Sequence, residues 1–345
     1  MDKSTLMLRL AAAGAALFLF GCASPPARTM DGPLVIAKQG SFFVGGRDVH
    51  SDTLSMLPAF ASTGTITLDQ MYVHYQVPLD AKRASITLIH GCCLTGKTWE
   101  TTPDGRMGWD EYFVRKGYAT YIVDQSWRGR SATDISAINE VKSGKAPAEK
   151  LPVVFAAAHE GAWAIFRFGA AYPEVFPGMK FPLEAQGEFW KQMVPDWSNA
   201  VPTPNPTVPA LSMLARQLGG TVLMSHSQSG IYPFQTAVLD TKGIAAIVSI
   251  EPAACPDPAS DMAPYTKMPI LVLFGDYVDL SPRWSPRLKR CRAFVAAANK
   301  AGGRTELVLL PDVGMHGNSH MLMQDTNSHQ VADWLLAWID KNVAN

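Results

Sequence analysis

Short apolar strands alternate with helical segments along most of this chain, and this rhythm is the feature that most restricts its fold. Runs typical of central strands lie at 85–91, 119–124, 221–224, 244–250, 270–274 and 306–310, and helical spacing is found at 109–116 and 331–339. Parallel strands need crossover connections, which are usually helices. The rhythm therefore predicts an α/β fold with a mostly parallel central sheet and helices on both faces.

The rhythm stops between residues 135 and 216. This interval is rich in aromatic residues, and it contains a run of prolines at 202, 204, 206 and 209 that we interpret as a stiff linker. The alternation resumes at Gly219, so the sequence predicts a cap insertion over the sheet. We expect the core at 34–134 and 217–345, with earlier strands at 42–46 and 71–77, and the cap at 135–216. Most of its aromatic side chains should form the cap's own core.

The N-terminus has the pattern of an export signal. Lys3 and Arg9 precede a short apolar run at 10–20, which is too short for a permanent membrane span. The following Leu-Phe-Gly-Cys22 resembles a bacterial lipobox, with simple cleavage near Ala23 as the alternative. We expect a signal peptide at 1–22, lipidation of Cys22 and a tether at 23–33. The protein would then be periplasmic or an outer-membrane-anchored lipoprotein, with the lipid as its only membrane attachment.

Composition excludes some classes of function. The 345 residues include 30 basic and 30 acidic side chains, so the chain lacks the basic footprint of a nucleic-acid-binding protein. No cysteine or histidine spacing suggests a metal site, and we expect no cofactor. An exported protein can form disulfides, and Cys255–Cys291 is a plausible pair. A cap with exposed apolar surface would allow a homodimer.

Ser227 stands where a buried strand ends and a helix begins. The run Ser225-His226-Ser227-Gln228-Ser229-Gly230 follows the apolar residues 221–224. This is the layout of a nucleophile elbow, although that motif usually has Gly at both flanks, where this chain has Ser225 and Ser229. The alternative is a serine-rich turn whose hydroxyls cap the helix.

Other chemically active residues follow neighbouring strands. His90-Gly91-Cys92-Cys93 comes after one strand, Glu251 after another, and His320 lies before the final helix. Carboxyl ends of parallel strands meet at one edge, where α/β proteins gather their sites. The order Ser227, Glu251, His320 is that of nucleophile, acid and base in serine hydrolases with this topology. The loop at Cys92 and the amide of Gln228 would bind an oxyanion.

The residue pattern leaves rivals for two of these roles. Asp276 and Asp279 follow the next strand, where the acid is more often found, and His316 competes with His320 as the base. His90 and His226 are better explained as structural or oxyanion-loop residues.

The chain resembles the small group of bacterial α/β-hydrolase-fold esterases that carry two adjacent cysteines at the oxyanion hole. Several motifs carry the resemblance: residues 40–49, His90 to Gly96, Asp124 to Ser131, Ser225 to Gly230, and Gly317 to Met321. Trp127 departs from the group, whose members can have a smaller residue there, and this leaves the local pocket shape open.

The resemblance implies that Ser227 is the nucleophile, Glu251 the acid and His320 the base. It also implies a Cys92–Cys93 disulfide that would fix the Cys92 or Cys93 amide beside Gln228 as the oxyanion hole. The expected activity is hydrolysis of a small-molecule ester. A lactonase or other C–O hydrolase with the same residues, and a non-catalytic envelope binding lipoprotein, remain as alternatives. With an unperturbed pKa of about 6.5 for His320, activity should fall at acidic pH.

Overall fold

A computed structural model describes residues 32–343; the predicted signal peptide, Cys22 and most of the tether lie outside them. One eight-stranded sheet has the order β1-β2-β4-β3-β5-β6-β7-β8. β1 pairs antiparallel with β2, and β2 with β4, whereas the other neighbours are parallel. The predicted α/β fold is therefore confirmed. The strands are β1 (Ile36–Ser51), β2 (Gly64–Pro78), β3 (Ser85–Ile89), β4 (Thr120–Asp124), β5 (Thr221–His226), β6 (Ile244–Ile250), β7 (Pro269–Phe274) and β8 (Arg304–Leu309).

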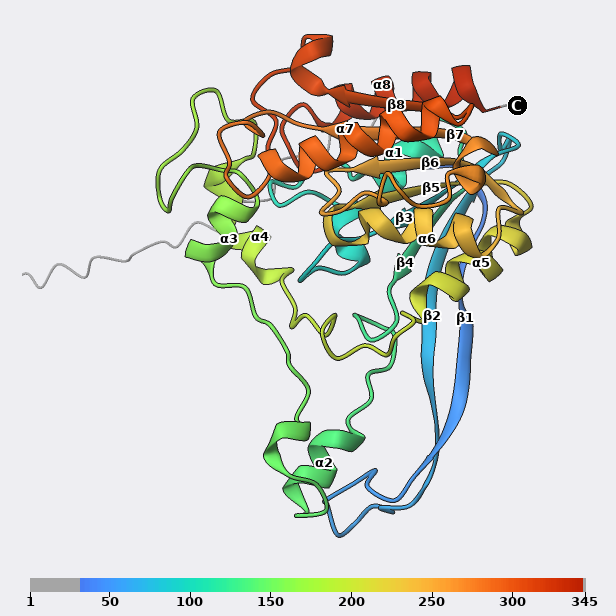
Figure 1. Cartoon of the computed structure of the whole chain (residues 1–345), viewed down its shortest axis with the longest axis vertical. Coiled ribbons are helices and arrows are strands. Elements are labelled where there is room, and N and C mark those ends of the chain that lie inside the picture. Colours follow the sequence, from blue (N-terminus) through green and yellow to red (C-terminus); the bar gives the residue numbers. More distant parts are fainter. Residues whose placement is uncertain (1–31, 344–345) are drawn as a thin grey trace, which may run out of the picture.

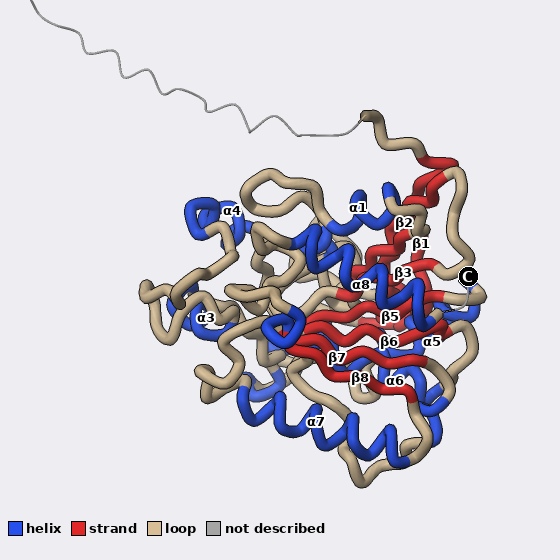
Figure 2. Tube along the Cα trace, turned by 90° about the horizontal axis from the view of Figure 1, so that it is seen from above, coloured by secondary structure: helices blue, strands red, loops and turns tan. Residues whose placement is uncertain are grey.

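Helices cover both faces of the sheet, since every residue of the central strands β3, β5 and β7 is buried. Successive side chains of a strand point to opposite faces. Val222 and Met224 therefore join one apolar cluster with α1 (Trp109–Arg115) and α8 (Ser328–Asn342). Leu223 joins the other cluster, with α5 (Thr207–Leu218), α6 (Tyr232–Leu239) and α7 (Ser285–Lys300). Figure 2 shows α1 and α8 on one side of the strands and α7 on the other.

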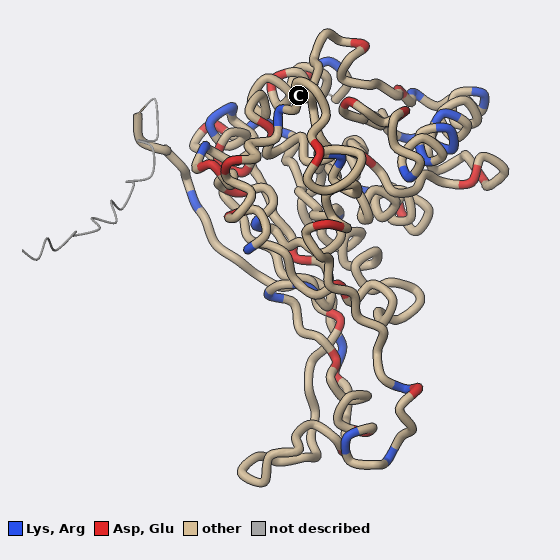
Figure 3. The backbone as a smooth tube through the Cα atoms, turned by 90° about the vertical axis from the view of Figure 1, so that its left-hand side faces the viewer, with Lys and Arg blue, Asp and Glu red and all other residues tan. Residues whose placement is uncertain are grey.

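β1 and β2 form a long hairpin that extends away from the sheet body (Figure 1). Both strands are much longer than the sequence predicted, because most of their outer residues are polar and give no apolar run. The short helix α2 (Ser136–Lys142) lies at the far end, where Asn139 donates a hydrogen bond to the Thr53 carbonyl (2.7 Å). Acidic and basic residues are interspersed over the β1–β2 hairpin and the sheet body (Figure 3), in keeping with the zero net charge.

The interval predicted as a cap contains α2, α3 (His159–Ile165) and α4 (Gln186–Lys191), with long loops between them. Its last part differs from the expected linker, because α5 begins at Thr207 and includes Pro209. A proline is tolerated in the first turn of a helix, where its missing N–H has no intrahelical partner. α5 packs in the same apolar cluster as Leu223, α6 and α7, so we assign it to the core. In residues 32–343 no helix has the length and apolarity needed to span a membrane.

Candidate active site

Ser227 occupies a tight turn at the carboxyl end of β5. Its φ is +58°, a left-handed conformation that non-glycine residues rarely adopt, and a short 3₁₀ turn then leads into α6. The Ser229 hydroxyl donates to the Ile89 carbonyl (3.1 Å) and ties this turn to β3. A Cβ on Gly91 would lie 2.9 Å from the Ser227 Cβ, so only glycine allows the 90–93 loop to approach. Ser229 at the flanking position thus fits a compact turn.

Glu251 and His320 form a hydrogen-bonded pair next to this turn. Glu251 directly follows β6, also with a positive φ (+53°), and its Oε2 lies 3.0 Å from His320 Nδ1. Both side chains are fully buried. The His320 ring centroid lies 4.6 Å from that of His226, the residue before Ser227. His320 Nε2 has no hydrogen-bond partner among the described residues, and it is therefore free to accept a proton.

The rival residues have other contacts. Asp276 accepts the Gly317 N–H through its Oδ2 (2.8 Å) and so supports the loop that carries His320. The His316 side chain is 71% exposed and lies 3.9 Å from the same carboxylate. His90 and His226 bond to the Gly91 and His320 carbonyls, as expected for structural residues. The structure thus brings Glu251, rather than Asp276, to the imidazole of His320.

Arg167, from the cap, is the second partner of Glu251. Its guanidinium binds both carboxylate oxygens: Nη1 lies 2.6 Å from Oε2, and Nη2 contacts Oε1. Its Nε donates to the Asp276 carbonyl (2.9 Å), and the side chain is fully buried. A planar guanidinium suits a carboxylate in this bidentate manner. The charge of Glu251 is therefore balanced within the protein.

This charge balance explains the protonation states. Burial alone would raise the pKa of Glu251, but Arg167 and the His320 hydrogen bond hold it at about 2. Burial, together with the charges of Arg167 and Arg283, lowers the pKa of His320 from 6.5 to about 4. Glu251 only partly opposes this decrease. His320 is therefore neutral at pH 7, and the acidic loss of activity predicted from its unperturbed pKa moves to lower pH.

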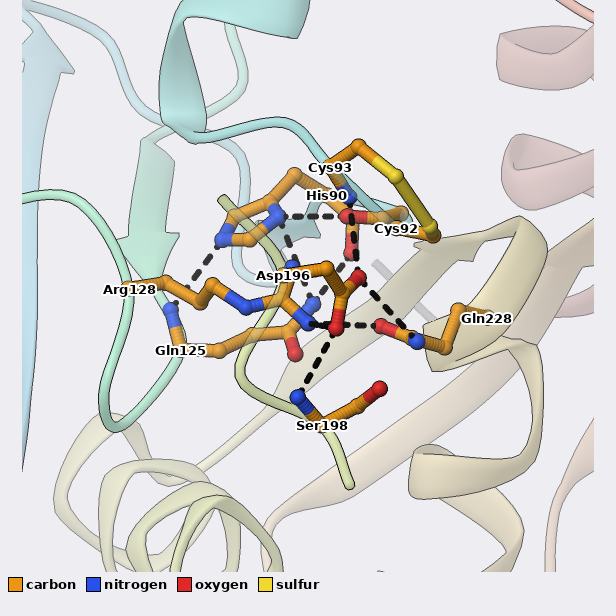
Figure 4. The surroundings of a disulfide bond; sticks show 9 residues. His90, Cys92, Cys93, Gln125, Arg128, Asp196, Ser198 and Gln228 are labelled. Atoms are coloured by element: carbon orange, nitrogen blue, oxygen red, sulfur yellow. Dashed lines mark hydrogen bonds and ion pairs between the residues drawn. A yellow bond between two sulfur atoms is a disulfide. The ribbon is translucent and has the colours of Figure 1, made fainter. Parts of the chain in front are cut away.

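A second buried ion pair supports the loop at Cys92 and Cys93 (Figure 4). Arg128 Nη2 lies 2.6 Å from Asp196 Oδ1, and both side chains are almost completely buried. Asp196 Oδ2 accepts the Cys93 N–H (3.0 Å) and the Gln228 side-chain amide (3.3 Å). Arg128 Nη2 also donates to the other end of that amide, Gln228 Oε1 (3.0 Å). The Cys93 N–H is thus occupied by Asp196.

Both expected disulfides, Cys92–Cys93 and Cys255–Cys291, are present. In the part of the chain that the structure describes, one group of possible metal ligands lies close together: Cys92, Cys93 and Asp196. The two sulfurs are bonded to each other, and the carboxylate is paired with Arg128. These residues are therefore unsuited to bind a metal ion in this state.

A cavity of about 940 Å³ opens beside Ser227. Cys92 and Gln228 line it with the serine, and cap residues between Phe155 and Phe176 form an apolar wall. Trp127 does not line it; its indole N–H instead donates to Asp69 Oδ1 (2.8 Å). The departure at Trp127 therefore lies outside the cavity lining.

Sequence reasoning missed Arg167 and Asp196, and it gave Arg128 no role. Arg167 stands between Phe166 and Phe168, and a charged residue within an aromatic run is a sign of a buried, paired charge. Asp196 shows no comparable signal, because its partners are distant in sequence.

The sequence and structure of this chain are similar to those of known ester-hydrolysing proteins. No family model matches the chain. The structure is similar to that of a novel bacterial esterase, with 65% sequence identity, a TM-score of 0.90, and coverage of 92% of this chain and 99% of that chain. The probable secreted lipase phiG of Fungal sp. (strain ATCC 74256) is 25% identical over 354 residues, covering 86% of this chain and 92% of the lipase. This chain therefore belongs to the same α/β-hydrolase family as that bacterial esterase.

Proposed function

We propose that this protein is an exported serine carboxylesterase that hydrolyses small or aromatic esters through an acyl-enzyme intermediate. One observation carries the proposal: the buried His320–Glu251 pair leaves His320 Nε2 without a partner, next to a left-handed turn that presents Ser227 to a cavity. A nucleophile, a neutral base and an acid that orients the base are the parts that acyl transfer needs. The kinship to an esterase and a lipase supports an ester as the substrate.

In the proposed reaction, the Ser227 oxygen attacks the ester carbonyl and its proton passes to His320 Nε2. His320 then protonates the leaving alcohol, and the acyl group stays on Ser227. A water molecule, deprotonated by His320, then attacks the acyl-enzyme. The resulting tetrahedral intermediate breaks down, releases the carboxylic acid and restores the serine. Glu251 keeps the proton on His320 Nδ1 throughout, so that Nε2 is the accepting nitrogen.

The backbone amides of Cys92 and Gln228 are our candidates for the oxyanion hole. Both residues line the cavity with Ser227, and Gln228 directly follows the nucleophile. The Cys93 amide, also expected from the sequence, is left out of the mechanism because it donates to Asp196. Fixed amide donors can stabilise an oxyanion without reorganisation during the reaction.

Ser227→Ala tests the nucleophile. With 4-nitrophenyl butanoate, we expect kcat to fall by at least about 10³-fold and fluorophosphonate labelling to disappear. Ser281→Ala is the matched control, since Ser281 lines the same cavity and should keep both properties. A Ser227→Ala variant that retains turnover would overturn the mechanism, and absent labelling of the wild type would favour a binding module. Faster opening of a γ-lactone than of matched linear esters would favour the lactonase alternative.

Export and lipidation of Cys22 belong to the same proposal. The relative's description as secreted and the presence of disulfides support export. Radiolabelled palmitate incorporated by the wild type but not by Cys22→Ala would establish the lipid anchor, and cleavage near Ala23 without labelling would refute it.

A further inference from the structure

The cavity beside Ser227 carries more positive than negative charge. Among the residues that the structure describes, its lining contains three arginines, Arg167, Arg283 and Arg287, and no acidic residue. Arg167 is neutralised by Glu251, as described above. Neither Arg283 nor Arg287 forms an ion pair with a carboxylate in residues 32–343, so two cationic side chains remain uncompensated in an otherwise mostly small and apolar lining.

Arg287 is held close to the nucleophile by backbone groups. Its Nε donates to the Ala253 carbonyl (3.1 Å), and the Ala253 N–H donates to the Ser227 carbonyl (2.9 Å). Its guanidinium also lies 5.2 Å from the ring centroid of Trp284, which packs against His320. These contacts orient the side chain, but carbonyl oxygens and an aromatic face do not cancel a full charge.

Arg283 lies four residues before Arg287, in the turn that leads into α7, and its carbonyl accepts a hydrogen bond from Arg287 Nη1. Burial lowers the pKa of Arg287, and the neighbouring charges of Arg283 and Arg290 lower it further. Like charges held together in this way repel each other. An anion bound between them would relieve the repulsion, and a guanidinium fork favours carboxylate over other polar groups.

We propose that Arg283 and Arg287 form an anion subsite, and that the preferred substrate is an ester that also carries an ionised carboxylate. This inference rests on the proposed function, since it places the carboxylate relative to Ser227. The carboxylate takes no part in bond making or breaking; it orients the ester while the apolar cap wall contacts the remainder. Hydrolysis then yields either a dicarboxylic acid or a hydroxy acid, according to the side of the ester that carries the charge.

Two matched substrate pairs test the subsite. 4-Carboxyphenyl butanoate and 4-carbamoylphenyl butanoate place the charge, or a neutral amide of the same shape, on the alcohol side. Monoethyl adipate and its terminal amide place the charge, or the neutral amide, on the acyl side. At pH 8 and low salt, we expect kcat/KM of the wild type to favour the carboxylate in at least one pair by about tenfold. Salt should reduce the preference through screening. The pair that shows this preference tells whether the carboxylate belongs on the alcohol side or on the acyl side of the ester.

Substitutions of arginines on and before α7 show which side chains cause the preference for the charged ester. Arg287→Gln and Arg283→Gln should each reduce the preference, measured as the ratio of kcat/KM for the charged ester to kcat/KM for its neutral partner in the same variant. Arg287→Lys should retain part of the preference. Arg292→Gln removes the same charge from α7 at a residue that does not line the cavity, so its preference should stay that of the wild type. Circular dichroism and thermal melting confirm that each variant is folded.

Equal kcat/KM within both pairs, or an unchanged preference in the Arg283→Gln, Arg287→Gln double variant, would overturn the subsite. The outcome is separate from that of the proposed function. If Ser227→Ala is inactive while charged and neutral esters react equally, only the subsite is wrong. If Ser227→Ala still hydrolyses the esters, the nucleophile is wrong.

Discussion

The candidate site is held by two buried arginine–carboxylate pairs whose roles differ. Arg167–Glu251 supports His320, and Arg128–Asp196 supports the loop at Cys93 and the Gln228 side chain. Each pair joins the interval predicted as a cap, 135–216, to a residue of the predicted core. In the first pair the cap supplies the cation, and in the second it supplies the carboxylate.

The difference lies in what each carboxylate touches besides its arginine. Glu251 contacts a group that gains and loses a proton, so its neutralisation by Arg167 changes the pKa of His320. Asp196 contacts amide groups that do not titrate, so its pair can act only on their position. We therefore expect the first pair to control protonation and the second to control geometry. Four predictions on kcat, in order of decreasing effect, and one on stability test this distinction.

Glu251→Gln should have the largest effect. The amide cannot hold the His320 tautomer as a carboxylate does, and it leaves the Arg167 charge unpaired, so we expect kcat to fall on the order of 10⁴-fold. Asp276→Asn is the control, because its amide oxygen can still accept the Gly317 N–H. A larger loss in the Asp276 variant would reassign the acid.

Asp196→Asn should lower kcat by about 10²-fold, because the loop at Cys92 and Cys93, our candidate for part of the oxyanion hole, loses its charged anchor and small displacements of catalytic groups are costly. The acid limb of the pH–rate profile should stay where it is in the wild type, since Asp196 does not contact His320. A shifted acid limb would show that this pair also affects protonation. Stopped-flow rates across pH 3–9 measure both quantities.

Arg167→Gln should have a smaller effect on kcat at pH 8 but a distinct effect on pH dependence. Protonated His320 cannot accept the serine proton, so the wild-type rate falls as pH drops through about 4. Without Arg167, the Glu251 charge stabilises the imidazolium, and the midpoint should move to higher pH. Arg167→Lys keeps the charge and should keep the low midpoint; equal midpoints in the Gln and Lys variants would contradict this account.

Stability gives an independent readout of the same residue. The native protein resists protonation of His320 down to a pKa of about 4, whereas the unfolded chain takes up that proton near 6.5. The free energy of unfolding should therefore decrease as pH falls from 6.5 to 4. Arg167→Gln should weaken this dependence and lower stability at pH 8 by about 3–5 kcal/mol, because a buried charge loses its partner. Urea titrations at several pH values measure both.

Opening the Cys92–Cys93 disulfide should have the smallest effect on kcat, less than about tenfold, because Asp196 still holds the Cys93 amide. We expect the Cys92→Ser, Cys93→Ser variant to lose more activity when combined with Asp196→Asn than the separate losses imply. Additive effects would show that the disulfide and the carboxylate act independently. Mass spectrometry under non-reducing conditions confirms the state of the bridge in the wild type.

The sequence was informative where apolar runs are continuous. The buried strands gave the sheet, and their carboxyl ends indicated Ser227, Glu251 and His320 as candidates. In the long β1–β2 hairpin only the parts at 42–46 and 71–77 were predicted, because its outer residues are mostly polar. α7 was not predicted, because cationic residues stand between its four buried residues, Leu288, Cys291, Phe294 and Ala298. Arg167 and Asp196 could not be assigned, because a buried charge depends on partners far away in the chain.

The placement of Arg167 and Asp196 has a consequence for protein engineering. Because each is half of a buried ion pair completed by the core, the cap cannot be exchanged as a detachable specificity module. A chimera with a cap from another protein would leave Glu251 and Arg128 as unpaired buried charges, unless Arg167 and Asp196 were transplanted with matching backbone geometry. Library designs should therefore vary the small apolar residues of the cap wall and keep these two residues fixed.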